Sequence, residues 1–332
     1  MMNIAIDAMG GDHAPEIVVE AVNMAIEEFE DLTISLYGDE TRIKPLLKPS
    51  NRVSVVHTTE EITMHDEPVK SIRRKKDSSL VVAARDVKDG KADALVSAGN
   101  TGALLAASLL IIGRIKGIDR PGIMPIIPTV NPDHPQFILM DSGANADCKA
   151  ENLHQFAILG NYYANKVLSI ENPRVGLINN GTEESKGNIL SKEAFELLKQ
   201  EPSINFVGNI EAKSLLEGSV DVAVTDGFTG NAILKSIEGT ASSLLQYIKE
   251  ILKNSGLKTK IGAGLIKEDL KRGLAMMDVN QAGGAVLLGV KAPVIKAHGS
   301  SNAMAMKNAI KQARKIVLSE ITQDITEFYE ES

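Results

Sequence analysis

Asn179-Asn-Gly-Thr-Glu-Glu-Ser-Lys-Gly-Asn188 is the stretch from which the fold can be read. The apolar run before it, Arg174-Val-Gly-Leu-Ile178, is typical of a buried strand. After it, apolar residues at positions 190, 194, 197 and 198 have the spacing of a helix that runs to about Gln200. The stretch is therefore a strand-to-helix loop, which is where open α/β sheets bind ligands.

This loop has the composition of an anion site. Gly181 and Gly187 let a ligand approach the backbone, because glycine has no Cβ. Asn180 and Thr182 supply neutral hydrogen-bond donors, and Lys186 supplies a cation. Taken alone, such a loop could equally be a solvated turn with a surface lysine.

The pattern of strand, polar glycine-containing loop and helix recurs along the chain. The further loops are Asp7–His13, Ser97–Gly102, Asp141–Asp147, Asp226–Asn231 and His298–Asn302. This alternation predicts a three-layer α/β/α sandwich with a mostly parallel sheet. Neither a linker nor a sequence repeat divides the chain, so we expect a single α/β domain over residues 1–332. Met124–Val130 contains two prolines and is expected to be an edge or connecting strand.

One segment departs from the sheet pattern. Ala241–Leu252 has one apolar helical face, and Asn254-Ser-Gly256 would end that helix. A second apolar stripe follows at positions 266, 270, 274 and 277, so we expect a helical hairpin insertion at about 240–278. Its tip alternates Leu257, Ile261 and Leu265 with lysines, which suits either dimer packing or an anionic membrane surface.

Composition narrows the class of protein. The net charge of −7, 4% aromatic residues and no tryptophan argue against nucleic acid as a partner. The single Cys148 excludes an internal disulfide and fits a reducing compartment. Met1–Asp7 is expected to be a strand rather than a signal peptide, and the apolar run 103–112 is too short to span a bilayer. We therefore expect a cytoplasmic protein.

The strand-end loops supply the candidate binding residues. Each loop precedes a helix N-terminus, where free N–H groups and the helix dipole favour anions. We expect the six strand ends to converge on a site for phosphate and a carbonyl group. Its candidate residues are Gly10, Gly11, Asp12, His13, Ser97, Gly99, Asn100, Thr101, Asp141, Asn145, Asn180, Gly181, Thr182, Asp226, Thr229 and His298.

Other chemistries remain open at this stage. The aspartates at positions 7, 12, 141, 147 and 226 could bind a divalent metal, but such residues also cap helices, and we expect no metal site. Cys148 at a helix start could be an acidic thiol, although a lone cysteine is more often a packing residue. The loops contain neither a P-loop nor a clean dinucleotide fingerprint.

The blocks together resemble the PlsX family, the phosphate acyltransferases of bacterial phospholipid synthesis. Asp7-Ala-Met-Gly-Gly-Asp-His-Ala-Pro15 is similar to the N-terminal signature of that family, and four other loops fall where it has glycine-rich blocks. The resemblance covers essentially the whole chain. It implies transfer of a long acyl chain from acyl carrier protein to inorganic phosphate. It also implies a homodimer, with a fold similar to phosphotransacetylases and isocitrate- or isopropylmalate-type dehydrogenases.

The residues suit that chemistry. Phosphate is itself a nucleophile, so the protein needs only to align it with a thioester and stabilise the oxyanion, without a cofactor. We expect Lys186 to neutralise charge and Asn231 to donate a hydrogen bond. His13 and His298 could move a proton, or make only structural hydrogen bonds. A metal- and NAD-dependent decarboxylating dehydrogenase and a non-catalytic membrane scaffold are the alternatives.

Partners follow from the same resemblance. Acyl carrier proteins are acidic, and the densest cationic run of the chain, which we expect to be their dock, is Arg73, Arg74, Lys75 and Lys76. The alternative is a solvated helix face. The family is peripherally associated with the membrane, so the hairpin tip is expected to contact anionic lipid. The membrane glycerol-3-phosphate acyltransferase that uses acyl phosphate is then a further expected partner.

Overall fold

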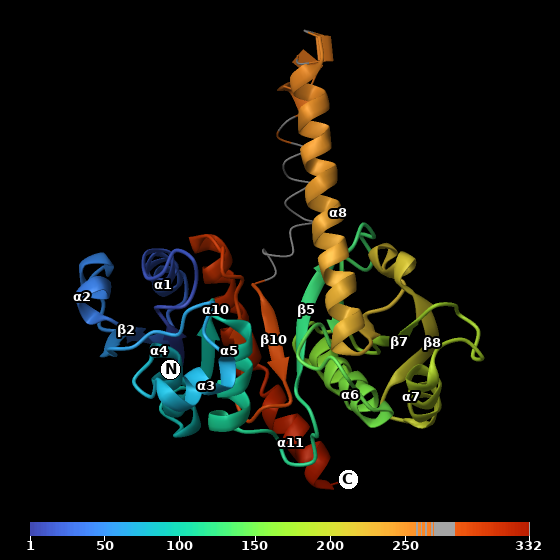
Figure 1. Cartoon of the computed structure of the whole chain (residues 1–332), viewed down its shortest axis with the longest axis horizontal. Helices are drawn as coiled ribbons and strands as arrows, with labels where there is room; N and C mark the ends of the chain where they lie inside the picture. Colours follow the sequence, from blue (N-terminus) through green and yellow to red (C-terminus); the bar gives the residue numbers. More distant parts are fainter. Residues whose placement is uncertain (257, 260, 263, 267, 269–282, 332) are drawn as a thin grey trace.

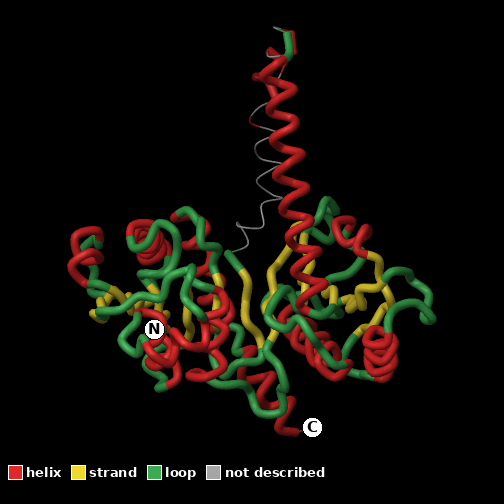
Figure 2. Tube along the Cα trace, viewed as in Figure 1, coloured by secondary structure: helices red, strands yellow, loops and turns green. Residues whose placement is uncertain are grey.

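A single sheet of eleven strands forms the centre of the part of the chain that the structure describes (Figures 1 and 2). The computed structural model describes residues 1–256, 258–259, 261–262, 264–266, 268 and 283–331. The strand order is β3-β2-β1-β4-β11-β10-β5-β6-β9-β7-β8. The strands are β1 (Met2–Asp7), β2 (Leu32–Gly38), β3 (Val53–His57), β4 (Ala94–Ser97), β5 (Gly122–Pro128), β6 (Gln136–Met140), β7 (Arg174–Asn179), β8 (Asn205–Glu211), β9 (Val222–Val224), β10 (Ala285–Leu288) and β11 (Val294–Lys296).

Helices cover both faces of this sheet, which confirms the three-layer prediction. They are α1 (Glu16–Glu28), α2 (Glu40–Ile43), α3 (Pro68–Arg74), α4 (Ser79–Lys88), α5 (Thr101–Ala107), α6 (Ala150–Lys166), α7 (Ile189–Gln200), α8 (Gly227–Asn254), α10 (Ala303–Leu318) and α11 (Ile321–Glu331). One face packs on α1, α6, α7 and α10. The other packs on α4 and α5 in one half and on α8 in the other. Successive residues of a strand point to opposite faces of the sheet: Ile138 of β6 packs in the core on one face, and Leu139 packs in the core on the other.

The sheet consists of two parallel halves that run in opposite directions. β1 to β4 and β11 are parallel to one another, and so are β6 to β9. Between them, β10 is antiparallel to both β11 and β5, and β5 is antiparallel to β6. Because the direction reverses here, the strand ends form two groups of loops. The expectation that six strand ends converge is therefore wrong.

β5 is an interior strand, so the edge interpretation of its prolines is wrong, and it connects the two halves instead. Residues 122–125 pair with β10, and residues 126–128 pair with β6. Pro125 is the last residue of the first ladder and Pro128 the last of the second. Proline lacks an N–H donor, and a ladder end is where that loss costs least.

Helix α8 projects from the body of the molecule (Figure 1). It is one continuous helix of 28 residues that already begins at Gly227, so the first arm of the expected hairpin grows directly out of the Asp226 loop. Ile261 and Leu265, beyond its end, are 58% and 80% exposed. Leu257 and most of the expected second arm lie outside the described residues. Among the described residues, no helix is both long and apolar enough to cross a bilayer.

Candidate functional site

Asp7 is the centre of the first group of loops, which follow β1, β4 and β11. Its buried carboxylate accepts hydrogen bonds from the hydroxyls of Ser79 at 2.6 Å and Ser97 at 2.7 Å. Burial raises the pKa of Asp7, and these donors oppose the rise. A Cβ at Gly10 would lie 2.6 Å from Oδ2 of Asp7 and 2.7 Å from the amide nitrogen of Gly99, so the close approach of these loops requires glycine.

Asn100 is buried, and both ends of its side chain are occupied. Its oxygen accepts the amide of Ala103 and caps α5, while its nitrogen donates to the carbonyls of Thr63, Met64 and Asp66. The side chain thus ties the 63–66 segment to the start of α5. A ligand at this loop would meet backbone groups and the exposed Thr101 rather than the Asn100 amide.

The rim of the first group is polar and accessible. Asp12, His13 and His298 are exposed, and the Asp12 amide donates to the Gly299 carbonyl at 2.9 Å. The His298 ring lies 2.8 Å from the Ser300 hydroxyl. A Cβ at Gly11 would lie 3.2 Å from the Ala98 side chain. The loops after β1, β4 and β11 therefore meet as the sequence predicts.

Asp141 is the centre of the second group, which follows β6, β7 and β9. Its buried carboxylate accepts the amides of Ile123, Ala144 and Asn145 and the side-chain amide of Asn145. Burial raises the pKa of Asp141, and these hydrogen bonds oppose the rise. Asn145 also donates to the Pro121 carbonyl. Asp141 and Asn145 therefore act as a scaffold between the loops.

The start of α8 packs directly on this scaffold. Asp226 caps the helix by accepting the amide and the hydroxyl of Thr229. A Cβ at Gly227 would lie 2.6 Å from Oδ2 of Asp141, and one at Gly230 would overlap with the Asp141 backbone oxygen. Asn231, the next residue in the chain, is exposed and lies close to Gly143.

The Lys186 loop is the neighbour of the α8 start, because β7 pairs with β9. Gly187 has a φ of +100°, and Asn188 caps α7 by accepting the Ser191 amide. Gly181 is buried under the Lys186 stem: a Cβ there would lie 3.0 Å from Cγ of Lys186. Within the described residues the Lys186 ammonium group has no hydrogen-bond or ion-pair partner, so its charge is available to a ligand.

Two lysines near the first group escaped the sequence analysis. Lys296 ends β11, and its amino group contacts the carbonyl oxygens of Ala98, at 3.4 Å, and Ala297. Burial, above all, and the charge of Lys235 lower the pKa of Lys296 to about 8, while Asp7 and Asp12 raise it. The sequence did carry a signal for Lys296, because a lysine interrupts the otherwise apolar strand 293–297. Lys235 carried no signal, because only the path of α8 brings it here.

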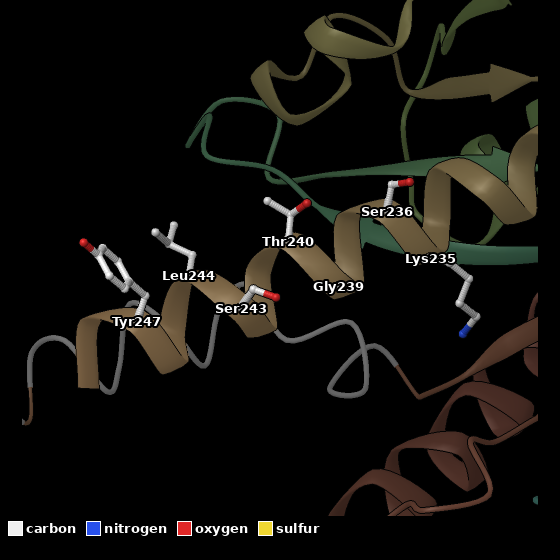
Figure 3. Close-up of a pocket in the computed structure, with 7 residues that line it drawn as sticks. All are labelled: Lys235, Ser236, Gly239, Thr240, Ser243, Leu244 and Tyr247. Atoms are coloured by element: carbon white, nitrogen blue, oxygen red, sulfur yellow. The ribbon is translucent and has the colours of Figure 1, made fainter. Parts of the chain in front are cut away.

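Lys235 also begins a shallow open depression along α8. Figure 3 shows its side chain extending toward the C-terminal elements of the first half. The depression is lined by Lys235, Ser236, Gly239, Thr240, Ser243, Leu244 and Tyr247. The described residues contain no group of three or more His, Cys, Asp or Glu side chains that could hold a metal ion.

Comparison with known proteins decides the family. Residues 2–324 match the family described as Fatty acid synthesis protein. The chain belongs to this family. The resemblance drawn from the sequence blocks is thereby confirmed.

Relatives of similar length support this membership. The chain is 56% identical to a Phosphate acyltransferase of Streptococcus suis, over 97% of this chain and 96% of that protein. It is 54% identical to a Phosphate acyltransferase of Pediococcus pentosaceus, over 99% and 95%. A third protein of the same name, from Streptococcus equi subsp. zooepidemicus, is 56% identical over 100% and 99%.

Solved structures share the fold. A phosphotransacetylase from Streptococcus pyogenes has a TM-score of 0.62 at 17% identity, over 95% of this chain and 94% of that one. A 4-hydroxythreonine-4-phosphate dehydrogenase from Klebsiella pneumoniae has a TM-score of 0.54 at 11% identity, over 95% and 99%. The predicted likeness to phosphotransacetylase and dehydrogenase-like folds is confirmed.

The contact between Gly230 and Asp141 predicts a stability effect that a second glycine of the same helix controls. Gly230→Ala forces a methyl group onto the Asp141 carbonyl and should lower the free energy of unfolding by about 1–3 kcal/mol. Gly239→Ala adds a methyl group with nothing within 4 Å and should raise it by up to about 1 kcal/mol. Denaturant unfolding followed by circular dichroism measures both, and equal effects would contradict the close contact.

Proposed function

We propose that this protein transfers a long acyl group from the thioester of acyl carrier protein to inorganic phosphate, which forms acyl phosphate for phospholipid synthesis. The observation that carries the proposal is the match, at 54–56% identity and over nearly full length, to proteins named Phosphate acyltransferase. The dehydrogenase alternative has only a fold likeness below 25% identity behind it. The scaffold alternative leaves the unpartnered donors of the second loop group without a role.

Direct attack of phosphate on the thioester suits the second group. Lys186 and Asn231 are exposed, and neither side chain has a hydrogen-bond partner within the described residues. Lys186 stands on the loop after β7 and Asn231 in the first turns of α8, and both backbones are held by caps and glycine contacts. Donors that are already oriented need little rearrangement when charge develops, and this is why such donors lower a barrier. We assign phosphate or the oxyanion to them, with backbone amides of Gly181 and Thr182 nearby.

The proposed basic dock is the end of α3, a helix whose start packs beside the first group. Arg73, Arg74 and Lys76 are exposed at the end of α3, whereas Lys75 pairs with Asp66 at 2.6 Å. α3 packs on α5, since a Cβ at Gly102 would lie 2.6 Å from the Pro68 ring. This contact is made by the first residue of α3, and the three exposed cations stand at the opposite end of the helix, where an acidic carrier protein could dock.

Helix α8 and the described residues beyond its end support the membrane and dimer proposals. Exposed Ile261 and Leu265 stand near Lys258 at its tip, a combination that suits anionic lipid. The stem exposes Leu244, Tyr247 and Ile251 on α8, a surface that a second copy of the chain would cover. Acyl phosphate is lipid-like, so release at a membrane would bring it to the acyltransferase that uses it.

Lys186→Ala tests the proposed site. Loss of one oriented cation should lower phosphate-dependent acyl transfer by about 10²-fold or more without unfolding the protein. The measurement is release of free carrier thiol together with hydroxylamine trapping of acyl phosphate. Lys192→Ala, an exposed lysine on α7, is the matched control and should keep wild-type turnover. Normal turnover of Lys186→Ala would remove that residue from the site, and a wild-type chain that forms no acyl phosphate would refute the function.

Cys148→Ser tests direct attack. Burial, together with the charges of Asp141 and Asp226, raises the pKa of the Cys148 thiol to about 11, so the thiol is protonated at neutral pH and is a poor nucleophile. The variant should therefore keep at least about half of the wild-type kcat/KM. A labelled acyl group trapped on Cys148 would contradict the mechanism.

Ile261→Glu with Leu265→Glu tests the tip. Removal of this apolar area should release the protein from anionic vesicles in a sedimentation assay, since interfacial binding scales with buried apolar area. Turnover of soluble substrate should change little. A variant that still sediments contradicts the membrane role, and one that becomes monomeric and inactive assigns these side chains to the dimer.

A further inference from the structure

Asn209 of β8 is a buried polar residue to which the acyl transfer described above gives no role. It is 6% exposed, and its side-chain oxygen has no hydrogen-bond partner within the described residues. Its side-chain nitrogen donates to the backbone carbonyl of Glu183 at 3.0 Å. Burial of an amide whose oxygen is unpaired lowers stability, so packing alone does not account for an asparagine at this position.

A β-bulge in β8 turns this side chain toward the Lys186 loop. Val175 of β7 pairs with Phe206 of β8. The next residue of β7, Gly176, pairs with Gly208, so β8 contains one extra residue between the two pairs. Gly208 has a φ of +94°, a conformation that glycine adopts readily. Bulges are common beside functional sites, where they re-aim a side chain.

The packing of β8 shows what the bulge changes. Phe206 packs against the core that α7 covers, whereas Ile210 packs in the core that α8 covers. In a regular strand, two residues four apart would point to the same face. The bulge reverses the alternation, so Asn209 lies on the α7 face, paired with Leu177 of β7. The Lys186 loop leads from β7 into that same helix.

The Glu183 carbonyl is the point at which Asn209 contacts the loop. This carbonyl also accepts the backbone N–H of Lys186 at 3.1 Å, a bond that closes the turn carrying Lys186. The Lys186 carbonyl in turn accepts the side-chain amide of Asn179 at 3.3 Å. Residues 182–186 are exposed, so polar contacts rather than burial must hold the turn. Asn209 supplies one such contact from a neighbouring strand.

We propose that Asn209 is a positioning residue, which holds this turn so that the Lys186 ammonium group faces phosphate. The inference rests on the proposed acyl transfer. Asn209 acts through the Glu183 carbonyl and the Lys186 backbone, and it touches no reacting atom. A charge that is fixed before the reaction needs little rearrangement in the transition state, and a displacement of about 1 Å can cost about 10²-fold in rate.

Asn209→Leu separates positioning from a structural role. Leucine is similar in shape but donates no hydrogen bond, and loss of the unpaired oxygen offsets loss of the donor, so Tm should change by less than about 4 °C. The kcat/KM for phosphate should fall by about 10-fold or more, while the KM for acyl carrier protein stays at its wild-type value. Asn209→Ala removes the same donor from a smaller side chain and should show the same kinetic loss. A lower Tm with unchanged phosphate kinetics in both variants would overturn the proposal.

Asn205→Leu is the matched control. Asn205 lies on the same strand, but it pairs with Arg174 at the start of β7, at the far end from the Lys186 loop. Its side-chain amide also donates to a backbone carbonyl, that of Asn172, at 3.5 Å. The variant should keep wild-type phosphate kinetics. A loss equal to that of Asn209→Leu would assign the effect to the strand as a whole and contradict the proposal.

A double-mutant cycle tests whether Asn209 acts through Lys186. In the Lys186→Ala background there is no ammonium group left to position, so Asn209→Leu should reduce the remaining turnover by less than about twofold. A further loss as large as in the wild-type background would show that Asn209 acts independently of Lys186, and the proposal would fail.

Amide hydrogen exchange provides a readout that needs no catalysis. The Lys186 amide should exchange faster in Asn209→Leu than in the wild-type chain or in Asn205→Leu, because the turn that protects it is loosened. Equal exchange in all three proteins would refute the positioning role. If the wild-type chain forms no acyl phosphate, the proposed function fails instead, and the exchange result still decides whether Asn209 holds the loop.

Discussion

Two buried carboxylates, Asp7 and Asp141, each lie at the end of a strand and each contact backbone where only glycine fits. A Cβ at Gly10 would lie 2.6 Å from the first, and a Cβ at Gly227 would lie 2.6 Å from the second. Neither carboxylate has a cation as its main partner. Serine hydroxyls donate hydrogen bonds to Asp7, and amide groups donate to Asp141. A buried charge that is hydrogen-bonded only by neutral donors sets the positions of those donors, so each carboxylate fixes the loops that bear the candidate site.

The reversal of strand direction at β10 and β5 gives the molecule two such centres instead of one. Each half then presents its own polar loops, and α8 is the element that leads from one to the other. It starts on the Asp141 scaffold and carries Lys235 to the neighbourhood of Lys296. In a protein of net charge −7, local cations at these loops decide where anions can bind. Lys186 lies in one group of loops and Lys296 in the other.

The sequence by itself determined the local structure of the chain. The spacing of apolar residues distinguishes strands from helices, and glycine, asparagine and aspartate mark the loops between them. Both signals are short-range, so they can be found in the sequence alone. The expected helix over 150–166 and the strand at 174–178 match α6 and β7 closely for this reason. The polar blocks also identified the family, since a set of glycine-rich loops along the whole chain is far more specific than any one of them.

Only the tertiary structure decided how those loops are grouped. Strand direction depends on pairing between distant segments, and no local pattern shows that β5 is antiparallel to both of its neighbours. The same holds for individual side chains. The sequence predicts that Asn100 donates to a ligand, yet its side-chain amide donates to three carbonyls of the 63–66 segment. Lys235 and Lys296 are 61 positions apart in the chain and affect each other only through space. Electrostatic influence follows distance and burial, and folding alone sets both.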